Sequence, residues 1–170
     1  IARLFPDAQF LVPQSKKYPD SVKQILGRIE GKFGSSYKSF ETQFITFPWM
    51  KNDEFLSLMH ATDIYLDLPS FSGYTTAWQG VNCGIPIVTF EVEFMRQRLA
   101  SGLLRKIGIT DTIAQSFEEY VSIVRRLAKL KERPEIWQEY RQKIKKADPK
   151  ADNDLSVVRG FEKFLLDAVV

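Results

Sequence analysis

The sequence predicts an α/β protein in which a parallel sheet is covered by helices on both faces. Short apolar runs typical of strands alternate with longer segments whose apolar residues recur at helical spacing. The connections are short, as expected for crossover helices between parallel strands. The chain has 170 residues, of which 44% are hydrophobic, and this is enough to bury one globular core.

The first part of the chain has the order strand, helix, strand, helix, strand. The strand candidates are the apolar runs at residues 10–12, 44–47 and 64–66. The first helix is predicted from a cap at Asp20 or Ser21 to a stop at Gly34, and the second over residues 53–61. This order predicts parallel strands joined by helices that pack on the sheet.

The alternation continues beyond residue 66. A helix is predicted from Thr75 to near Gly84, where a turn leads into a strand over residues 87–90. A further helix over residues 95–107 and a short strand at residues 113–114 complete the alternating part of the chain.

The remainder of the chain is predicted to be helical. Ser116 and Glu119 form a capping box for a helix with one apolar stripe, and a second helix covers residues 136–144. In the last helix four residues share one face and are expected to face the core: Val158, Phe161, Leu165 and Ala168. Truncation of Phe161 is therefore expected to destabilise the fold.

We expect a single lobe over residues 1–170, with an α/β core over residues 1–115 and a helical part over residues 116–170. The chain begins at Ile1 with a pattern that resembles the end of a helix running directly into a strand. The lobe is therefore expected to be incomplete at its N-terminal edge.

The charge distribution excludes several classes of partner. There are 24 Lys and Arg against 21 Asp and Glu, which gives a net charge of only +3 and no strong electrostatic footprint for nucleic acid. No apolar run approaches the roughly twenty residues of a membrane-spanning helix, and no leader begins the chain. We expect a soluble, cytoplasmic protein that binds neither nucleic acid nor membrane.

The single cysteine and the single histidine give little support to nucleophilic or metal chemistry. One cysteine, Cys83, excludes an internal disulfide and fits a reducing compartment. No cysteine or histidine lies near it in sequence, so a core position is favoured over a catalytic thiol. The only histidine, His60, lies within a helical pattern, which favours a packed or surface ring over a metal ligand.

The most informative segment is the polar loop that joins the strand at residues 64–66 to the helix at Thr75. Ser72 and Gly73 interrupt the apolar run, and Thr75 and Thr76 open the helix. Because a helix start carries free N–H groups and about half a positive charge, this arrangement suits a diphosphate. Gly73 would let the backbone approach the ligand, so Gly73→Val is expected to abolish binding with little loss of stability.

The alternative is that this loop is an ordinary turn in which Thr75 or Thr76 caps the helix. The G-x-G-x-x-G and P-loop patterns are both absent, which argues against a dinucleotide oxidoreductase and a P-loop NTPase. A nucleotide bound through a less glycine-rich loop remains. The loops after the strands at residues 44–47, 64–66 and 87–90 are expected to share one rim, where such sheets bind ligands.

Two segments carry a family resemblance. DIYLDLPSFSGYTTAWQGVNCGIPIVTF, from Asp63, and RLASGLLRKIGITDTIAQSFEEYVSIVRRLA, from Arg98, resemble the carboxyl-terminal lobe of the O-GlcNAc transferases and bacterial cytoplasmic N-glycosyltransferases. The resemblance covers most of the chain and implies the Rossmann-like carboxyl-terminal half of a GT-B glycosyltransferase with extra C-terminal helices. It implies inverting transfer of GlcNAc or a hexose from a UDP-sugar to a protein side chain.

The resemblance also implies a binding site for the UDP-sugar. Gly73, Thr75 and Thr76 match the loop that contacts the diphosphate, and Lys51 matches a lysine that reaches the nucleotide. Ser72, Tyr74 and Gln79 complete the predicted nucleotide-binding set. Tyr74 stands where the family has His, and Gln79 stands where an Asp would meet the nucleotide. No cofactor and no metal ion are expected, and no catalytic residue can be named.

The family's amino-terminal lobe, which supplies much of the acceptor site, is absent from these 170 residues, so the predicted partners include that lobe, on the same or another chain. The fragment by itself is expected to be inactive. Two alternatives stay open: a degenerate, non-catalytic nucleotide-binding or protein-interaction module, and an unrelated α/β enzyme with a similar loop.

Overall fold

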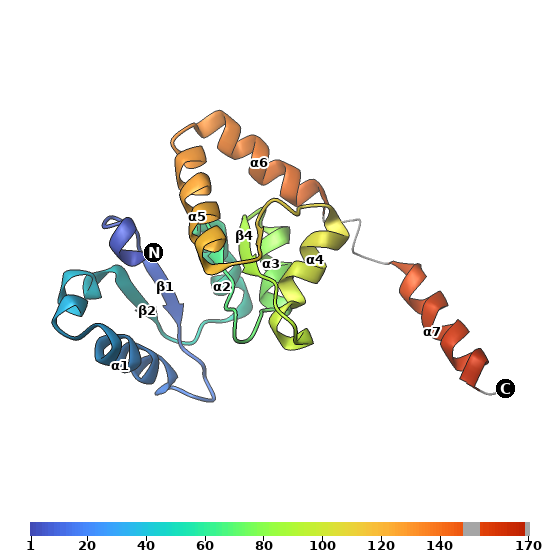
Figure 1. The fold of residues 1–170 in the computed structure, drawn as a ribbon, viewed down its shortest axis with the longest axis horizontal. Coiled ribbons are helices and arrows are strands. Elements are labelled where there is room, and N and C mark those ends of the chain that lie inside the picture. Colours follow the sequence, from blue (N-terminus) through green and yellow to red (C-terminus); the bar gives the residue numbers. More distant parts are fainter. Residues whose placement is uncertain (148–153, 169–170) are drawn as a thin grey trace. The chain divides into compact units, whose positions relative to one another are not determined.

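The computed structural model describes residues 1–147 and 154–168. The chain divides into two compact units, Ile1–Ser57 and Leu58–Val170, and each is described by itself. Figure 1 shows the order of the elements along the chain.

The first unit is built on two parallel strands. Its elements in chain order are η1 (Ala2–Leu4), β1 (Phe10–Pro13), α1 (Ser21–Phe33), η2 (Gly34–Ser39), η3 (Glu41–Gln43) and β2 (Phe44–Phe47). Strands β1 and β2 pair in register, with Phe10 opposite Phe44 and their rings stacked at 5.2 Å. Tyr37 and Phe40 are buried beside this pair, so aromatic packing holds the unit together.

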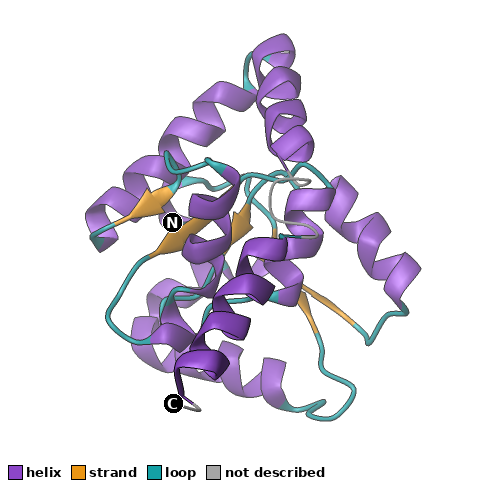
Figure 2. Cartoon of the chain, turned by 90° about the vertical axis from the view of Figure 1, so that its right-hand side faces the viewer, coloured by secondary structure: helices purple, strands orange, loops and turns teal. Residues whose placement is uncertain are grey.

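Helix α2 (Asn52–Ala61) begins in the first unit and ends in the second. The remaining elements of the second unit are β3 (Tyr65–Leu66), α3 (Thr75–Asn82), β4 (Ile87–Phe90), η4 (Met95–Gln97), α4 (Leu99–Ile107), β5 (Ile113–Ala114), α5 (Phe117–Lys131), α6 (Pro134–Ala147) and α7 (Leu155–Ala168). The three strands are parallel and lie in the order β3-β4-β5. Figure 2 shows how short the strands are beside the helices.

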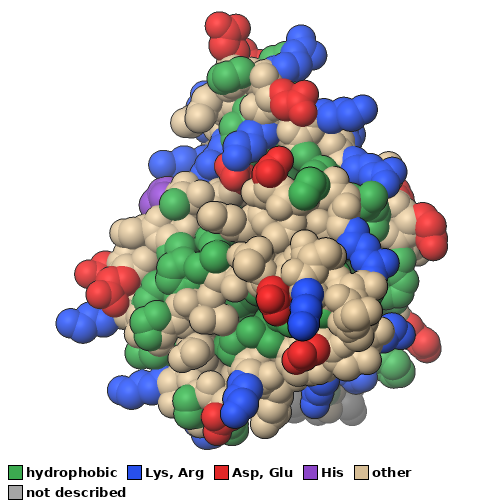
Figure 3. Space-filling model, turned by 90° about the vertical axis from the view of Figure 1, so that its left-hand side faces the viewer, with side chains coloured by type: hydrophobic (Ala, Val, Ile, Leu, Met, Phe, Trp, Pro, Cys, Tyr) green, Lys and Arg blue, Asp and Glu red, His purple; other side chains and the backbone are tan. Residues whose placement is uncertain are grey.

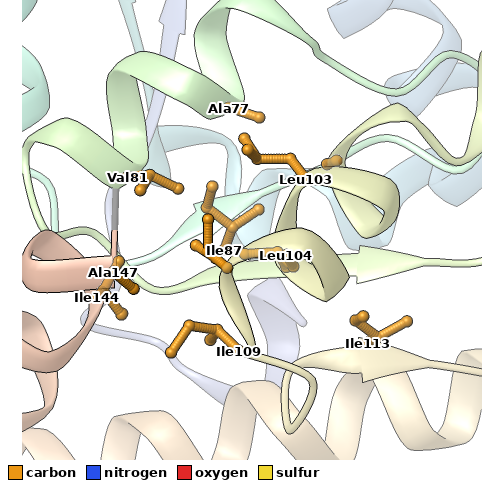
Figure 4. Packing of buried hydrophobic residues seen from close by; sticks show 11 residues of the cluster. Ala77, Val81, Ile87, Leu103, Leu104, Ile109, Ile113, Ile144 and Ala147 are labelled. Atoms are coloured by element: carbon orange, nitrogen blue, oxygen red, sulfur yellow. The ribbon is translucent and has the colours of Figure 1, made fainter. Parts of the chain in front are cut away.

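Strand β4 is the centre of the second unit. Ile87, Val88 and Thr89 are almost completely buried, as expected for a strand with neighbours on both sides and helices on its faces. Figure 4 shows the apolar cluster around Ile87, to which Val81 of α3, Leu104 of α4 and Ile144 of α6 contribute. Each of these three helices buries one face of this kind and exposes the other.

The structure confirms the predicted α/β class and the parallel pairing of the strands. The described strands form a two-stranded and a three-stranded sheet, one in each unit. The predicted helix at residues 95–107 is interrupted at Arg98, between η4 and α4. The single lobe expected over residues 1–170, with its core over residues 1–115, stays a prediction.

The expectation for the last helix is wrong. Helix α7 forms, but Val158, Phe161 and Leu165 are 50%, 61% and 47% exposed, and Ala168 is exposed as well. Helical periodicity predicts which side chains share a face, whereas burial also requires a surface that covers the face. The polar connector that the sequence predicts over residues 148–154 lies mostly outside the described residues. Within residues 1–147 and 154–168, no helix combines the length and apolar character needed to cross a membrane.

Candidate functional site

The loops that follow β3 and β4 are joined by hydrogen bonds at the carboxyl ends of these strands. The backbone N–H of Ser72 donates to the Arg96 carbonyl (2.8 Å), and the Gln97 side chain donates to the Pro69 carbonyl (3.0 Å). The Ala100 N–H at the start of α4 donates to Ser72 Oγ (2.8 Å). The prediction of one rim shared by three loops is therefore confirmed for these two. The loop after β2 lies in the other unit.

Asp67, the residue directly after β3, organises this rim. It is 2% exposed, and its Oδ2 atom accepts hydrogen bonds from Ser72 Oγ (2.6 Å) and Thr89 Oγ1 (2.7 Å). Its Oδ1 atom accepts one from the Gly73 N–H (2.8 Å). Three donors compensate the loss of water around this buried carboxylate, since each bond to a charged group contributes about 1.5–3 kcal/mol.

Asp67 was not among the predicted site residues. The sequence carries a signal for it, because the acid ends a strand candidate and is followed at once by a Ser- and Gly-containing loop. Its main-chain carbonyl is also used, as it accepts a hydrogen bond from the Tyr120 hydroxyl (3.0 Å). Burial, reinforced by the negative charge of Asp67, raises the pKa of Tyr120, so this phenol stays a neutral donor.

Two predicted ligand contacts, Ser72 and Gly73, are engaged within the protein. Ser72 is 0% exposed, and its hydroxyl donates to Asp67 and accepts from Ala100. The Gly73 N–H already donates to Asp67. A Cβ atom at Gly73 would lie 2.4 Å from the Tyr65 hydroxyl oxygen. In Gly73→Val the added side chain would therefore displace the Tyr65 hydroxyl. The expectation that this variant loses little stability stays a prediction.

The start of α3 is open to a ligand. Its N-cap residue is Tyr74, no side chain makes a capping hydrogen bond there, and its first turn holds no acidic residue. The alternative in which Thr75 or Thr76 caps the helix is therefore wrong. Thr75 is exposed, and half-buried Thr76 has a side-chain hydrogen bond with the Tyr65 hydroxyl. Half-buried Gln79 lies one turn further along the same face. Two hydroxyls thus lie at the positive end of a helix dipole.

The structure brings six of the seven predicted nucleotide-binding residues together, on the segment from Ser72 to Gln79. The seventh, Lys51, lies in the first unit with an exposed side chain, directly before α2. Its carbonyl accepts a hydrogen bond from the Phe55 N–H (2.9 Å), and its own N–H donates to the Glu54 carboxylate (2.8 Å). The bond to Glu54 is one half of a capping box, so the Lys51 backbone is held at the start of α2 while its side chain is exposed.

The fold is shared with a solved glycosyltransferase. A mutant of the Thermobaculum terrenum O-GlcNAc transferase superimposes with a TM-score of 0.62 at 22% sequence identity, over 88% of this chain and 32% of that chain. The similarity defines the class of fold: a Rossmann-like α/β protein of the GT-B type, with helices packed against parallel strands.

The sequence comparisons define the family. The model of glycosyl transferase family 41 matches residues 37–159, which is more than half of the chain. This chain belongs to glycosyl transferase family 41. It is also 37% identical over 65 residues to the UDP-N-acetylglucosamine--peptide N-acetylglucosaminyltransferase of Caenorhabditis elegans, a match covering 38% of this chain and 6% of that protein. The resemblance to O-GlcNAc transferases is confirmed, and the chain spans only a small part of these relatives.

Proposed function

We propose that this chain is the donor-binding lobe of an inverting glycosyltransferase that transfers GlcNAc or a hexose from a UDP-sugar to a protein side chain. The observation that carries the proposal is the uncapped start of α3, with Thr75 and Thr76 in its first turn. Membership of glycosyl transferase family 41 supports the reaction class, and the similarity to the Caenorhabditis elegans UDP-N-acetylglucosamine--peptide N-acetylglucosaminyltransferase supports a UDP-sugar and a protein acceptor.

The geometry separates residues that would touch the diphosphate from residues that position the loop. Ser72 and Gly73 donate to Asp67, so their role is to fix the loop path before α3. The Thr75 hydroxyl and the first N–H groups of α3 would contact the phosphates, with Tyr74, Thr76 and Gln79 beside them, and the Thr76 hydroxyl is shared with Tyr65. Such donors stabilise the negative charge that develops on a departing diphosphate, and the proposal requires no metal ion.

Lys51 enters this proposal through the family resemblance alone. An ammonium group near the nucleotide would contribute one positive charge to the bound diphosphate. Lys51→Met is therefore tested separately from the residues of α3, and a loss of UDP affinity would assign the lysine to the site.

The test is the melting temperature of the protein with millimolar UDP, compared with UMP, GDP and ADP. A ligand that binds only the folded state raises the melting temperature, by an amount set by its concentration relative to its Kd. We expect a rise with UDP that exceeds the rise with UMP. Thr75→Val is expected to weaken UDP binding about tenfold or more, as for the loss of one charge-assisted hydrogen bond.

Thr110→Val is the matched control. Thr110 is an exposed threonine just before β5, at the opposite end of the strands from the Asp67 loop. This variant should keep the UDP response of the unmodified chain. A response that is absent, or equal for all four nucleotides, would instead support a non-catalytic module. One observation favours that second candidate, since Asp67 already takes the Gly73 N–H that a diphosphate would use.

A further inference from the structure

A polar cavity of about 300 Å³ lies at the carboxyl-terminal end of α3, away from the candidate nucleotide loop at the amino-terminal end of that helix. Helix α6 contributes Gln138, Arg141, Gln142 and Lys145 to its wall. His60 of α2 and the Cys83–Gly84 turn complete the lining. We propose that this cavity, here called the Cys83 pocket, binds the phosphate group of a small phosphate compound.

The pocket exists because α6 packs directly on the turn after α3. Gly84 has φ +68°, and a Cβ atom there would lie 2.8 Å from the main-chain oxygen of Arg141. Only glycine allows both this conformation and this approach. The contact presents one face of α6 to the ends of α2 and α3, because positions 138, 141, 142 and 145 recur at helical spacing.

The charge balance of the pocket leaves an excess of positive charge. The carboxyl-terminal ends of α2 and α3 contribute about half a negative charge each. Arg141 offsets them, since its Nη2 atom donates to the His60 carbonyl (3.4 Å) and to the Cys83 carbonyl (3.3 Å). The Lys145 ammonium then remains, and no carboxylate belongs to the described lining residues. The described lining residues of the pocket therefore carry about one net positive charge.

The donor set favours a phosphate group. An ammonium group, a guanidinium group and two carboxamides come from one helix face, and a tetrahedral oxyanion accepts hydrogen bonds from several directions at once. A bare phosphate fills only part of the pocket, so there is room for the remainder of an organic phosphate.

The thiol in this pocket is not ionised and therefore does not act as the anion. Cys83 Sγ lies 3.7 Å from His60 Nε2. The sequence does not indicate this contact, because 22 residues separate the two positions. Burial is the largest influence and raises the pKa of the Cys83 thiol, while Arg141 and Lys145 act in the opposite direction. The sulfur therefore stays neutral and adds no negative charge to the described lining of the pocket.

The pocket provides its own reporters, because His60 is the only histidine and Cys83 the only cysteine of the chain. The His60 ring resonances would be followed by NMR during titration with inorganic phosphate, glycerol phosphate or malate, at constant pH and ionic strength. We expect saturable shifts with the phosphates and weaker binding of malate. Tighter binding of glycerol phosphate than of inorganic phosphate would identify an organic phosphate, and equal binding would identify phosphate itself.

Two lysine variants with the same change of charge provide the control. Lys145→Met removes the lysine that lines the pocket and should weaken phosphate binding about tenfold or more, as for the loss of a charge-assisted hydrogen bond. Lys146→Met removes an exposed neighbour that is not part of the lining, and it should leave the titration unchanged. Equal effects of the two variants, shifts that do not saturate, or tighter binding of malate would overturn the proposal.

A chemical measurement gives a second readout. Phosphate bound in the pocket should slow alkylation of Cys83 by iodoacetamide, followed by intact mass, and this protection should be lost in Lys145→Met. Undiminished alkylation at saturating phosphate would contradict the assignment. Thr75→Val should change neither readout, so failure of the nucleotide proposal and failure of this one are distinguishable.

Discussion

Asp67 shows how one buried residue at the end of a strand can determine the shape of a ligand loop. Its carboxylate joins the loop residues Ser72 and Gly73 to Thr89 of β4, and its carbonyl is tied to Tyr120 of α5. The loop that leads into α3 is thus fixed by contacts to two other elements.

We expect Thr89→Val to destabilise the protein by about 1 kcal/mol and Asp67→Asn by about 1.5–3 kcal/mol. Valine matches threonine in shape and removes one donor from the carboxylate, whereas the amide of asparagine turns hydrogen atoms toward groups that also donate. Urea unfolding would measure both changes. If Asp67→Asn were as stable as the unmodified chain, the carboxylate would not be the anchor of the loop.

Gly84 and Gly108 form a second informative pair of residues. Both have positive φ, at +68° and +77°, but a Cβ atom at Gly108 meets nothing within 4 Å. Gly108→Ala should therefore lower the free energy of unfolding by about 1–2 kcal/mol, because alanine is strained in the left-handed conformation and meets no other atom. Gly84→Ala should cost a further 1–3 kcal/mol, roughly the penalty of overpacking, because its methyl group meets the backbone of α6. Thermal melts of the two variants give the difference, and equal losses would argue against the close contact.

The helices α5 and α7 show what an amphipathic element does with and without a covering surface. In α5 a local motif starts the helix: Ser116 Oγ accepts from the Glu119 N–H (3.1 Å), and the Glu119 carboxylate accepts from the Gln115 N–H (2.7 Å). The predicted capping box is thus present with its second bond shifted by one residue. Leu127 of α5 is 0% exposed, whereas Leu166 of α7 is 72% exposed.

Leucine-to-alanine substitutions in the two helices should differ strongly in their effect on the free energy of unfolding. Leu127→Ala is expected to cost about 2–5 kcal/mol, because it opens a cavity in the core. Leu166→Ala should change the free energy of unfolding by less than about 0.5 kcal/mol, since its side chain is exposed. Denaturant unfolding of both variants is the measurement. A large loss in Leu166→Ala would show that α7 is covered in solution.

The start of α7 is held by an ion pair that predicts a pH dependence. Lys106 of α4 donates to the Asp154 carboxylate, and this bond, followed by those from Ser156, lowers the pKa of Asp154 to about 2. The folded-state pKa lies below the ordinary value of 3.8. The contribution of the ionised carboxylate to the free energy of unfolding is therefore complete above pH 3.8 and is lost as the pH falls through about 2. Titration of the carboxyl carbon by NMR would measure this pKa. In Lys106→Met it should rise toward the ordinary value, and an unchanged titration would exclude the pair.

At the scale of the whole molecule, stability is concentrated around β4 of the second unit. This strand pairs with β3 and β5 and lies beneath α3, α4 and α5. On the face drawn in Figure 3, basic and acidic side chains are interspersed, in agreement with the net charge of +3. The protein's recognition properties are therefore expected to arise from local sites such as the α3 start and the Cys83 pocket.

The rate of amide hydrogen exchange should follow the distribution of buried residues between β4 and the other elements. The amides of β4 are expected to exchange most slowly and those of α7 most rapidly, since exchange protection tracks burial and packing. Exchange followed by mass spectrometry on peptides of each element would test this order. Protection of α7 equal to that of β4 would reveal a stable docking surface for that helix.

Much of the candidate site was predictable from the sequence, and the reason is local chemistry. The Ser72–Gly73 break followed by Thr75 and Thr76 predicted a loop and a helix start, and the helix begins at Thr75. The sequence did not predict which loop residues bind Asp67 and which remain accessible to a ligand. Ser72 and Gly73 bind Asp67 across five and six positions, and the reason for glycine at residue 73 is the hydroxyl of Tyr65.

The sequence by itself determined the alternation of strands and helices, their approximate bounds, and the family, because periodicity, caps and turn residues act between positions a few residues apart. Only the tertiary structure decided that Thr89 and Tyr120 meet Asp67, that Cys83 meets His60, and that the apolar face of α7 is exposed. These outcomes depend on which surfaces pack together. A buried carboxylate requires hydrogen-bond donors, and an apolar stripe requires a surface that covers it. Packing between distant segments decides which residues supply them.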